Sequence, residues 1–246
     1  MKTVFITGAT EGIGYEFVQL FAQPDYELVL VARNEEKLQR IVQQLSEKGI
    51  KSHYYAKNLS RVENAIFICN DLKIKNITID YAINNAGFGI SESFIDTEWE
   101  KENSMYGLNM ISLAYFTKQF AIDMKQKGFG RILNFGSTAA FQPIPYMAAY
   151  AATKAFVLSL SQAVDYELKG TNVRVLTLCP GVTTSLFHAT ANTEKSLLQS
   201  SLLPVATAKE VALYGFRLLM KQKTVGVHGM LNRLFIFVQR FLRHVS

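Results

Sequence analysis

The strongest constraint on how this chain can fold lies in its first residues, where a β-rich run leads into a glycine-rich turn. Residues 2–7 (KTVFIT) fit a buried strand, residues 7–14 form the turn Thr-Gly-Ala-Thr-Glu-Gly-Ile-Gly, and a helical pattern follows over 12–23. Glycines in such a turn let the backbone approach a pyrophosphate, which the free N–H groups of the helix N-terminus attract. The order strand, turn and helix therefore predicts a dinucleotide-binding unit; a glycine turn without a ligand is the alternative.

Apolar β-rich runs and helical patterns alternate along the rest of the chain. This alternation predicts a parallel sheet with helices on both faces, and no linker or repeat interrupts it. We therefore expect an α/β doubly wound sheet, the Rossmann fold, as a single domain over residues 1–246. The further strands are expected at 26–32, 51–56, 79–84, 130–136 and 172–178, and the helices at 34–48, 60–70, 98–127 and 148–169.

Composition and charge narrow the class of protein. Hydrophobic residues make up 49% of the 246 residues, enough for a sizeable core. The net charge of +6 arises wholly after Glu210, beyond which six basic and no acidic residues remain, so we expect no nucleic-acid face. The two cysteines predict core thiols in a reducing, cytoplasmic setting, and we expect no metal site. We also expect no signal peptide, and no apolar run reaches the roughly 18 residues of a membrane span.

The end of the second expected strand bears on the choice of cofactor. It reads Val-Ala-Arg-Asn over residues 31–34. An acidic residue here would bind the adenosine ribose hydroxyls of NAD, whereas an arginine suits a 2′-phosphate. Arg33 therefore predicts NADP(H), although an ordinary surface arginine is the alternative. Glu11 occupies the glycine turn, so this prediction depends mainly on Arg33.

A tyrosine and a lysine supply the expected catalytic pair. Tyr150 and Lys154 are four residues apart within the helical segment 148–169, which places both side chains on one helix face. A nearby ammonium lowers the pKa of a phenol, so the tyrosine could give a proton to a carbonyl oxygen or take one from an alcohol. About one such spacing is expected by chance, so its context carries the interpretation.

A serine adds that context. Ser137 lies at the end of the strand 130–136, at the carboxyl edge of the sheet, where ligands bind in open α/β folds. Its hydroxyl could hydrogen-bond the substrate oxygen. A helix or turn cap is the alternative for this residue.

In their order along the chain, these motifs resemble the short-chain dehydrogenase/reductase family, and in particular its bacterial DltE-type and 3-oxoacyl reductase-like members. The resemblance covers about residues 2–185 and includes Asn-Asn-Ala-Gly at 84–87 and Pro-Gly from Pro180. It implies pro-S hydride transfer between NADP(H) and a carbonyl or alcohol carbon. Asn58 and Ser185 depart from the family pattern, which has Asp and Thr at these places.

The resemblance also assigns roles to residues of this chain. Asn109, in the long helix, would help to hold a water near Lys154, with a solvated asparagine as the alternative. Lys154 would also bind the nicotinamide ribose. The expected catalytic residues are Asn109, Ser137, Tyr150 and Lys154. The expected cofactor contacts are Gly8, Thr10, Gly12, Ile13, Gly14, Arg33, Asn58, Leu59, Asn85, Ala86, Gly87, Tyr150, Lys154, Pro180, Gly181, Val182 and Thr183.

Two variable segments follow the motifs. Residues 183–204 would form a lid over the substrate, and their leucines favour a lipophilic or acyl compound if they do not simply pack on the domain. Residues 230–246 form a basic, apolar segment with helical spacing. Such a segment can rest on a membrane surface or pack against its own domain or a second subunit.

The sequence thus predicts an oxidoreductase that uses NADP(H) to reduce a lipophilic ketone or 3-oxoacyl substrate. The expected partners are this small molecule, a second subunit in a homodimer or homotetramer, and through 230–246 a membrane surface. An NADP-binding sensor or scaffold of the same fold is the main alternative, but it would not need the Tyr150–Lys154 pair. A nucleotide-sugar epimerase is a weaker alternative, because its glycine turn has another spacing.

Overall fold

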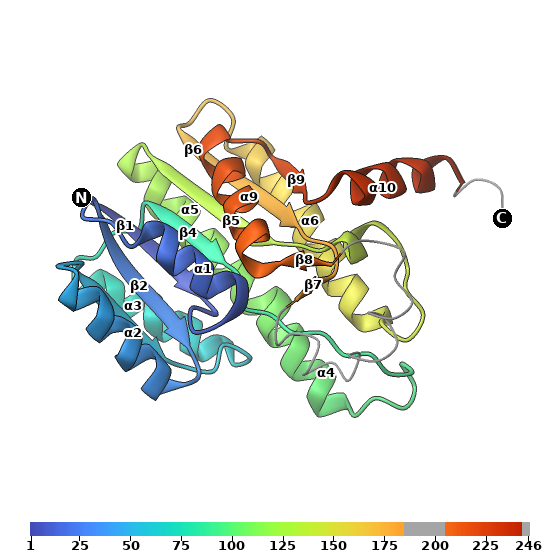
Figure 1. Ribbon diagram of the computed structural model, residues 1–246, viewed down its shortest axis with the longest axis horizontal. Coiled ribbons are helices and arrows are strands. Elements are labelled where there is room, and N and C mark those ends of the chain that lie inside the picture. The colour runs from blue at the N-terminus through green and yellow to red at the C-terminus, as the bar shows by residue number, and fades with distance from the viewer. Residues whose placement is uncertain (185–204, 243–246) are drawn as a thin grey trace.

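The computed structural model describes residues 1–184 and 205–242, and Figure 1 shows their arrangement around one central sheet. The sheet is parallel throughout, with the strand order β3-β2-β1-β4-β5-β6-β9. This order confirms the doubly wound α/β fold. The strands are β1 (Lys2–Thr7), β2 (Tyr26–Ala32), β3 (Ser52–Ala56), β4 (Tyr81–Asn84), β5 (Gly130–Phe135), β6 (Val173–Cys179) and β9 (Val225–Val227).

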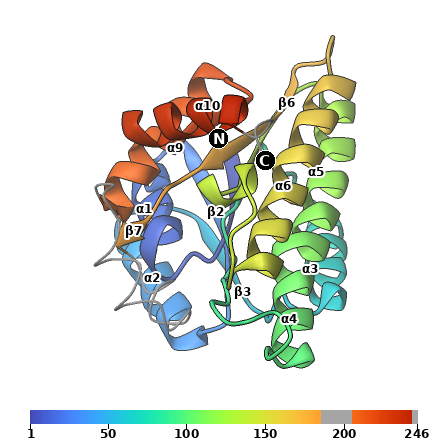
Figure 2. The ribbon, with the colours of Figure 1, turned by 90° about the vertical axis from the view of Figure 1, so that its right-hand side faces the viewer.

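Helices cover both faces of this sheet (Figure 2). On one face lie α1 (Gly12–Phe21), α2 (Glu35–Glu47) and α9 (Ala208–Lys221), which share one apolar core with the strands. The opposite face carries α3 (Val62–Ile74), α5 (Leu113–Lys127) and α6 (Ala148–Glu167) around a second core. Residues 27–32 of β2 are all buried, as a strand between two helical layers requires.

Local signals in the sequence explain where several helices begin and end. The Asn34 side chain accepts a hydrogen bond from the Lys37 backbone at the start of α2. Thr207 and Glu210 form a capping box at the start of α9. Gly128 ends α5 in the left-handed conformation that glycine adopts without strain.

The long helix expected at 98–127 is interrupted. It consists of α4 (Trp99–Tyr106), a π-helical segment, η1 (Gly107–Ser112), and α5. The prediction of one regular helix was therefore wrong in its middle, because a π-turn accommodates an extra residue and changes the direction of its side chains. Other boundaries moved by a few residues: α3 extends to Ile74, and β4 begins at Tyr81.

The last part of the chain contains helices and strands that we did not predict from the sequence or for which we left alternatives. The helix α9 and the strand β9 were not predicted, and β7 (Thr183–Thr184) pairs with β8 (Ala206–Thr207) in a small second sheet. The helical spacing of the C-terminal segment is confirmed by α10 (Met230–Leu242), which projects from the body in Figure 1.

Three features that the composition raised can be examined in the structure: the cysteines, membrane-spanning helices and metal-binding clusters. Cys69 and Cys179 are buried free thiols, as expected. In the described part of the chain, no helix is both long and apolar enough to cross a membrane. The same residues contain no cluster of metal-ligating side chains.

Candidate active site

A cavity of about 1040 Å³ lies at the carboxyl edge of the sheet. The segments that follow β1 to β6 contribute to its wall, and the chain crosses from one face of the sheet to the other between the neighbouring strands β1 and β4. Such a topological switch point is the place where open α/β sheets bind ligands. All of the expected site residues line this cavity except Gly14 and Asn109, which lie directly behind its wall.

The glycine turn forms one end of the cavity. Gly8 and Gly12 have positive φ angles of 68° and 55°, which other residues rarely adopt. A Cβ on Gly14 would lie 2.1 Å from the Gly8 carbonyl oxygen, so Gly14 lets the first turn of α1 approach the loop. Glu11, at the N-cap, makes no capping hydrogen bond to α1. The N–H groups at this helix end can therefore bind an anion, and the turn fits a pyrophosphate.

The Asn-Asn-Ala-Gly segment is tied to this turn. The Asn85 amide donates a hydrogen bond to the Thr7 carbonyl oxygen at 3.0 Å, and the Ala86 N–H donates to the Thr7 hydroxyl at 2.9 Å. The Asn84 amide points elsewhere, into the sheet, where it donates to Asn134 at 2.9 Å. The segment thus fixes the end of β4 against the end of β1 and positions its backbone along the cavity.

Basic side chains gather in the cavity wall beside the glycine turn. Arg33 lines the cavity as expected, together with Lys37 and Lys57, which the sequence analysis did not single out. Lys37 lies in the first turn of α2, and its closeness to Arg33 in the sequence could have identified it. Its ammonium forms an ion pair of 3.1 Å with Glu11, so the acid in the turn is partly neutralised.

The loop after β3 meets this end of the cavity too. Asn58 lines it, but its amide oxygen accepts a hydrogen bond from the Ser60 N–H at 3.0 Å and so shapes the turn. Leu59 is buried, and its carbonyl oxygen accepts a hydrogen bond of 2.6 Å from Ser112. The structure therefore positions Asn58 and Leu59 at the cavity and gives the Asn58 side chain a local partner.

Tyr150 and Lys154 project from α6 into the middle of the cavity, where both are buried. Burial raises the pKa of Tyr150 to about 12, although a hydrogen bond with Ser137 acts in the opposite direction. Burial lowers the pKa of Lys154 to about 8. The phenol pKa is therefore raised and not lowered as expected, because desolvation has the largest effect; the Lys154 ammonium lies 5.8 Å from the centre of the tyrosine ring.

The Lys154 ammonium is held by the strand beside it. It donates a hydrogen bond of 2.8 Å to the Phe135 carbonyl oxygen, at the end of β5. Ser137 follows two residues later and serves two purposes. Its hydroxyl accepts a hydrogen bond of 3.1 Å from the Ala139 N–H at the start of the 3-10 helix η2 (Thr138–Phe141), and it also bonds Tyr150. The capping interpretation of Ser137 is thus confirmed, and its catalytic role stays a prediction.

Asn109 lies behind the cavity wall, within η1. Its amide oxygen accepts a hydrogen bond of 3.2 Å from the Phe88 N–H, and its nitrogen donates to the Phe88 carbonyl at 2.8 Å. The residue is buried, so the solvated alternative is wrong. A Cβ on Gly87 would lie 3.1 Å from the Asn109 oxygen and 3.5 Å from the Lys154 nitrogen, which places both polar groups beside the same backbone atom.

The segment after β6 closes the cavity from a further side. Pro180, Gly181, Val182 and Thr183 all line it, and the Thr183 hydroxyl donates to the Gly181 carbonyl oxygen at 3.0 Å. Ser185 and most of the expected lid, residues 185–204, lie outside the described residues.

The remaining wall is apolar and comes partly from an unexpected element. Ile144 and Met147 contribute from the loop before α6, and Phe235 and Ile236 contribute from α10. On α10, Asn232 packs against the Pro180 turn: a Cβ on Gly181 would lie 2.5 Å from its amide nitrogen. From the sequence we expected residues 230–246 to pack on the domain, bind a second subunit or rest on a membrane surface, and we did not expect them at the site.

The comparisons with known proteins agree with this geometry. A family model described as short chain dehydrogenase matches residues 2–196. An uncharacterized oxidoreductase of Bacillus subtilis, YvrD, is 35% identical over 183 residues, which are 74% of this chain and 68% of that protein. A very-long-chain 3-oxoacyl-CoA reductase of Neurospora crassa is 33% identical over 69% of this chain, which spans only about half (52%) of that reductase.

One solved structure shows the same arrangement over the whole chain. The short-chain dehydrogenase from Sphingobium yanoikuyae in complex with NADPH has a TM-score of 0.86 and 28% sequence identity. The match covers 100% of this chain and 97% of that one.

Proposed function

The chain belongs to the short-chain dehydrogenase/reductase family of oxidoreductases, which act on a carbonyl or alcohol carbon with a nicotinamide cofactor, and we propose that its own reaction is the NADPH-dependent reduction of a lipophilic ketone or 3-oxoacyl group. One observation carries this proposal above all others. A buried tyrosine, Tyr150, is hydrogen-bonded to Ser137 and lies beside Lys154 in the cavity that the glycine turn begins.

The three side chains have complementary tasks in such a reduction. The bound cofactor supplies the hydride. Ser137 would donate a hydrogen bond to the carbonyl oxygen and hold it near Tyr150. Tyr150 keeps its proton at neutral pH, because burial raises its pKa to about 12, and so it can donate that proton to the oxygen as negative charge develops there. The positive charge of Lys154 would stabilise the resulting phenolate.

Asn109 and Gly87 would support this group from behind. Asn109 fixes the Phe88 backbone with two hydrogen bonds, so the segment after Gly87 keeps its path along the cavity. The oxygen of Asn109 and the nitrogen of Lys154 both lie close to the position that a Cβ on Gly87 would occupy, and a water can bridge neighbouring polar groups of this kind. We propose that this pair holds the water through which Tyr150 recovers its proton.

The preference for NADP(H) is proposed from the basic end of the cavity. Arg33, Lys37 and Lys57 lie where a 2′-phosphate would follow a pyrophosphate bound at the glycine turn. An arginine fork and two ammonium groups favour a dianionic phosphate over neutral ribose hydroxyls. The acid Glu11 is already paired with Lys37, which reduces its repulsion of the phosphate.

The substrate class is proposed from the apolar wall. Ile144, Met147, Phe235 and Ile236 would contact an apolar substituent on the carbonyl carbon. The similarity to a protein named very-long-chain 3-oxoacyl-CoA reductase supports an acyl chain. The lid formed by 183–204, the assembly into a homodimer or homotetramer and the cytoplasmic location stay predictions.

The reaction is tested by NADPH oxidation over a panel of ketones, aldehydes and 3-oxoacyl thioesters. We expect turnover with lipophilic members, and Tyr150→Phe should reduce kcat by roughly 10²–10⁴-fold while NADPH still binds. Tyr166→Phe is the matched control, because Tyr166 lies on the same helix but is exposed. Equal turnover by Tyr150→Phe and the wild type would exclude the proposed proton donor. Tight NADPH binding without turnover on any substrate would favour the sensor alternative.

The cofactor preference is tested separately, by the dissociation constants of NADPH and NADH. Arg33 and Lys37 would contact only the 2′-phosphate. Arg33→Ala and Lys37→Ala should therefore each raise the dissociation constant of NADPH about tenfold or more and leave that of NADH nearly unchanged. Lys48→Ala, at the far end of α2, should change neither constant. An equal loss of affinity for NADPH and NADH would show that these residues do not discriminate between the two cofactors.

A further inference from the structure

The C-terminal helix α10 carries a continuous apolar surface that faces solvent. Successive residues of a helix are rotated by about 100°, so positions three and four apart share a side. On α10 these positions fall into one arc, and at least 42% of each apolar side chain on it is exposed. We call this surface the outer face of α10. It consists of Met230, Leu231, Leu234, Phe235, Phe237 and Val238.

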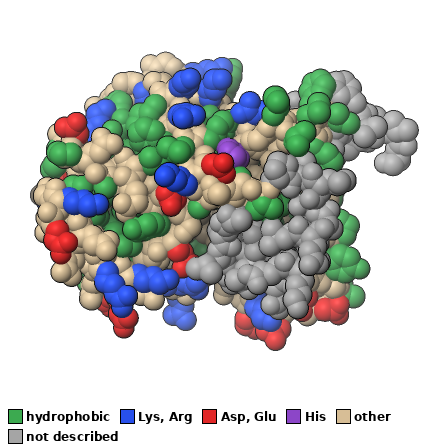
Figure 3. All heavy atoms as spheres, in the orientation of Figure 1, with side chains coloured by type: hydrophobic (Ala, Val, Ile, Leu, Met, Phe, Trp, Pro, Cys, Tyr) green, Lys and Arg blue, Asp and Glu red, His purple; other side chains and the backbone are tan. Residues whose placement is uncertain are grey.

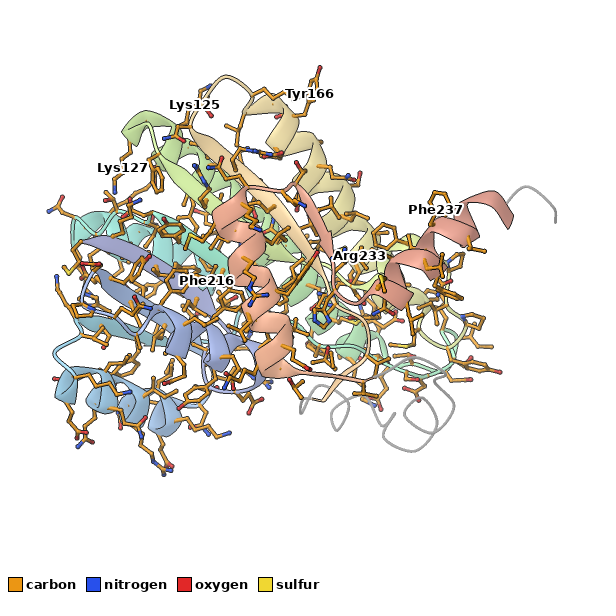
Figure 4. The ribbon with its side chains drawn as sticks, turned by 45° about the horizontal axis from the view of Figure 1, so that its top comes forward. Lys125, Lys127, Tyr166, Phe216, Arg233 and Phe237 are labelled. Carbon is orange, nitrogen blue, oxygen red and sulfur yellow. The ribbon has the colours of Figure 1, made fainter. Side chains whose placement is uncertain are left out.

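The base of the same helix is fastened to the body. Arg233, on the edge of the outer face, donates hydrogen bonds of 2.8 Å to the Val227 carbonyl oxygen and to the Tyr214 hydroxyl. Asn232 donates to the His228 carbonyl oxygen at 2.8 Å. Figure 4 shows Arg233 where α10 leaves the body and Phe237 farther out along the helix. The helix therefore has a defined base from which the outer face is presented.

The outer face is visible as a surface feature. In Figure 3, hydrophobic side chains gather at the upper right, where α10 leaves the body. Scattered single apolar residues are common on soluble proteins, but contiguous ones mark a surface that is covered by something else. The occupant could be a second copy of this chain, another protein or a lipid surface.

Charge decides between these occupants. After Glu210 the chain has no acidic residue and six basic ones, namely Arg217, Lys221, Lys223, Arg233, Arg240 and Arg243. Of these, Arg233 and Arg240 belong to α10 itself, and a contact between two copies of the helix would bring their like charges close together. An anionic phospholipid surface would instead attract them and accept the apolar residues between headgroups and acyl chains.

We propose that α10 docks this protein on an anionic phospholipid membrane, with the outer face inserted at the headgroup boundary and without crossing the bilayer. Phe235, at the edge of the outer face, and Ile236 beside it also line the active-site cavity. Docking therefore places the apolar wall of the site at the membrane surface. If the proposed reduction is correct, the substrate is a ketone or acyl compound dissolved in the bilayer.

The docking is tested by co-sedimentation of the full chain with vesicles of phosphatidylcholine alone or mixed with phosphatidylglycerol. We expect binding to the mixed vesicles, weaker binding at high salt, and little binding to the neutral ones. The double variant Leu234→Glu/Val238→Glu, in the middle of the outer face, should lower the bound fraction at least tenfold. The control Ile66→Glu/Ile74→Glu, which makes the same charge change at exposed positions of α3, should bind like the wild type.

Two results would overturn the proposal. One is a wild type that stays in the supernatant with anionic vesicles. The other is equal binding by both double variants, which would mean that binding depends on net charge alone. Light scattering of both variants in solution adds a readout of assembly. A loss of dimers in Leu234→Glu/Val238→Glu without any vesicle binding by the wild type would assign the outer face to a second copy.

The kinetic consequence depends on the proposed reaction and is measured apart from docking. For a long-chain ketone supplied in anionic vesicles, Leu234→Glu/Val238→Glu should raise KM about tenfold. For a short, water-soluble ketone the same variant should keep the wild-type rate, since neither residue lines the cavity. Vesicle binding without any ketone reduction would leave the docking intact and refute only the proposed reaction.

Discussion

At the scale of single residues, the site contains a buried charged group that lowers the stability of the fold. This group is Lys154. It is buried, its ammonium has one hydrogen bond to the Phe135 carbonyl oxygen, and burial lowers its pKa from 10.5 to about 8. The unfolded chain would bind this proton more tightly than the folded one. The charged lysine therefore opposes folding below pH 8, and its cost declines as the pH rises from about 8 to 10.5.

Replacing this lysine should stabilise the protein while it abolishes catalysis. Lys154→Met keeps most of the side-chain volume and removes the buried charge, so we expect a gain of about 2 kcal/mol at pH 7 after the lost hydrogen bond is subtracted. The gain should shrink as the pH rises above 8. Thermal unfolding of the cofactor-free protein between pH 6 and 9.5 measures it. The exposed Lys118→Met should show no such pH dependence; a gain independent of pH in Lys154→Met would argue against the buried charge as its cause.

At the scale of elements, the interruption of the long helix by η1 places two residues of the site. The π-helical segment buries Asn109 toward Phe88 and Ser112 toward Leu59. Gly107, where this segment begins, packs against the loop after β3: a Cβ there would lie 2.1 Å from the Ser60 carbonyl oxygen. A side chain at this position would push the helix away from the loop that borders the cofactor end of the cavity.

Gly107→Ala should therefore destabilise the protein, although alanine is the better helix former. We expect a loss of about 1–3 kcal/mol from this contact, against the 0.5–1 kcal/mol gain that the exchange usually gives within a helix. Ser104→Ala, at an exposed position of α4, is the control and should be neutral or slightly stabilising. Denaturant unfolding measures both, and a stabilised Gly107→Ala would show that the loop gives way without cost.

A second element-scale feature joins α6, β6 and the turn before β9. Burial would raise the pKa of Asp165, but hydrogen bonds from the Arg174 guanidinium, the Val175 N–H and the Thr224 hydroxyl hold it below its ordinary value. The two Arg174 contacts are both 2.8 Å long. A carboxylate with a lowered pKa stabilises the fold above the pKa of the unfolded chain, and this contribution is lost as the pH falls through the folded value.

Asp165→Asn should lower the free energy of unfolding by about 2–3 kcal/mol at pH 7, because the charge-assisted bonds to Arg174 are lost. Since acid removes the same charge from the wild type, the difference between the two proteins should shrink as the pH falls below the ordinary carboxyl pKa of 3.8 and through the lower pKa of the folded state. Urea unfolding at several pH values checks this. Asp25→Asn, in an exposed turn, should match the wild type throughout; an unchanged difference at low pH would contradict the role of the ion pair.

At the scale of the whole molecule, the cavity draws on the ends of six strands and on both helical layers. A ligand that fills it contacts segments from the glycine turn to α10 and binds only the folded chain. Cofactor binding should therefore stabilise the entire domain, by about 2.7 kcal/mol at a concentration 100 times the dissociation constant.

For a chain of this size we expect NADPH at that concentration to raise Tm by roughly 5–10 °C. Tyr150→Phe should keep this shift, because the substitution removes only the phenol hydroxyl and leaves the cavity intact. Gly14→Val should lose it, since a Cβ at Gly14 meets the Gly8 carbonyl oxygen and distorts the phosphate turn. Differential scanning fluorimetry compares the three proteins. A full NADPH shift in Gly14→Val would mean that the cofactor does not use this turn.

The sequence by itself determined the family, six of the seven strands of the sheet and most of the residues around the cavity. Short-range patterns were sufficient for these, because a strand followed by Gly8 to Gly14, or a tyrosine four residues before a lysine, is written in adjacent positions. The tertiary structure decided the rest. It showed that burial, more than Lys154, sets the pKa of Tyr150, that Asn109 binds Phe88 from a π-helix, and that α10 supplies part of the apolar wall. Each of these depends on which distant segments pack together and exclude water, and such contacts leave no local trace in the order of residues.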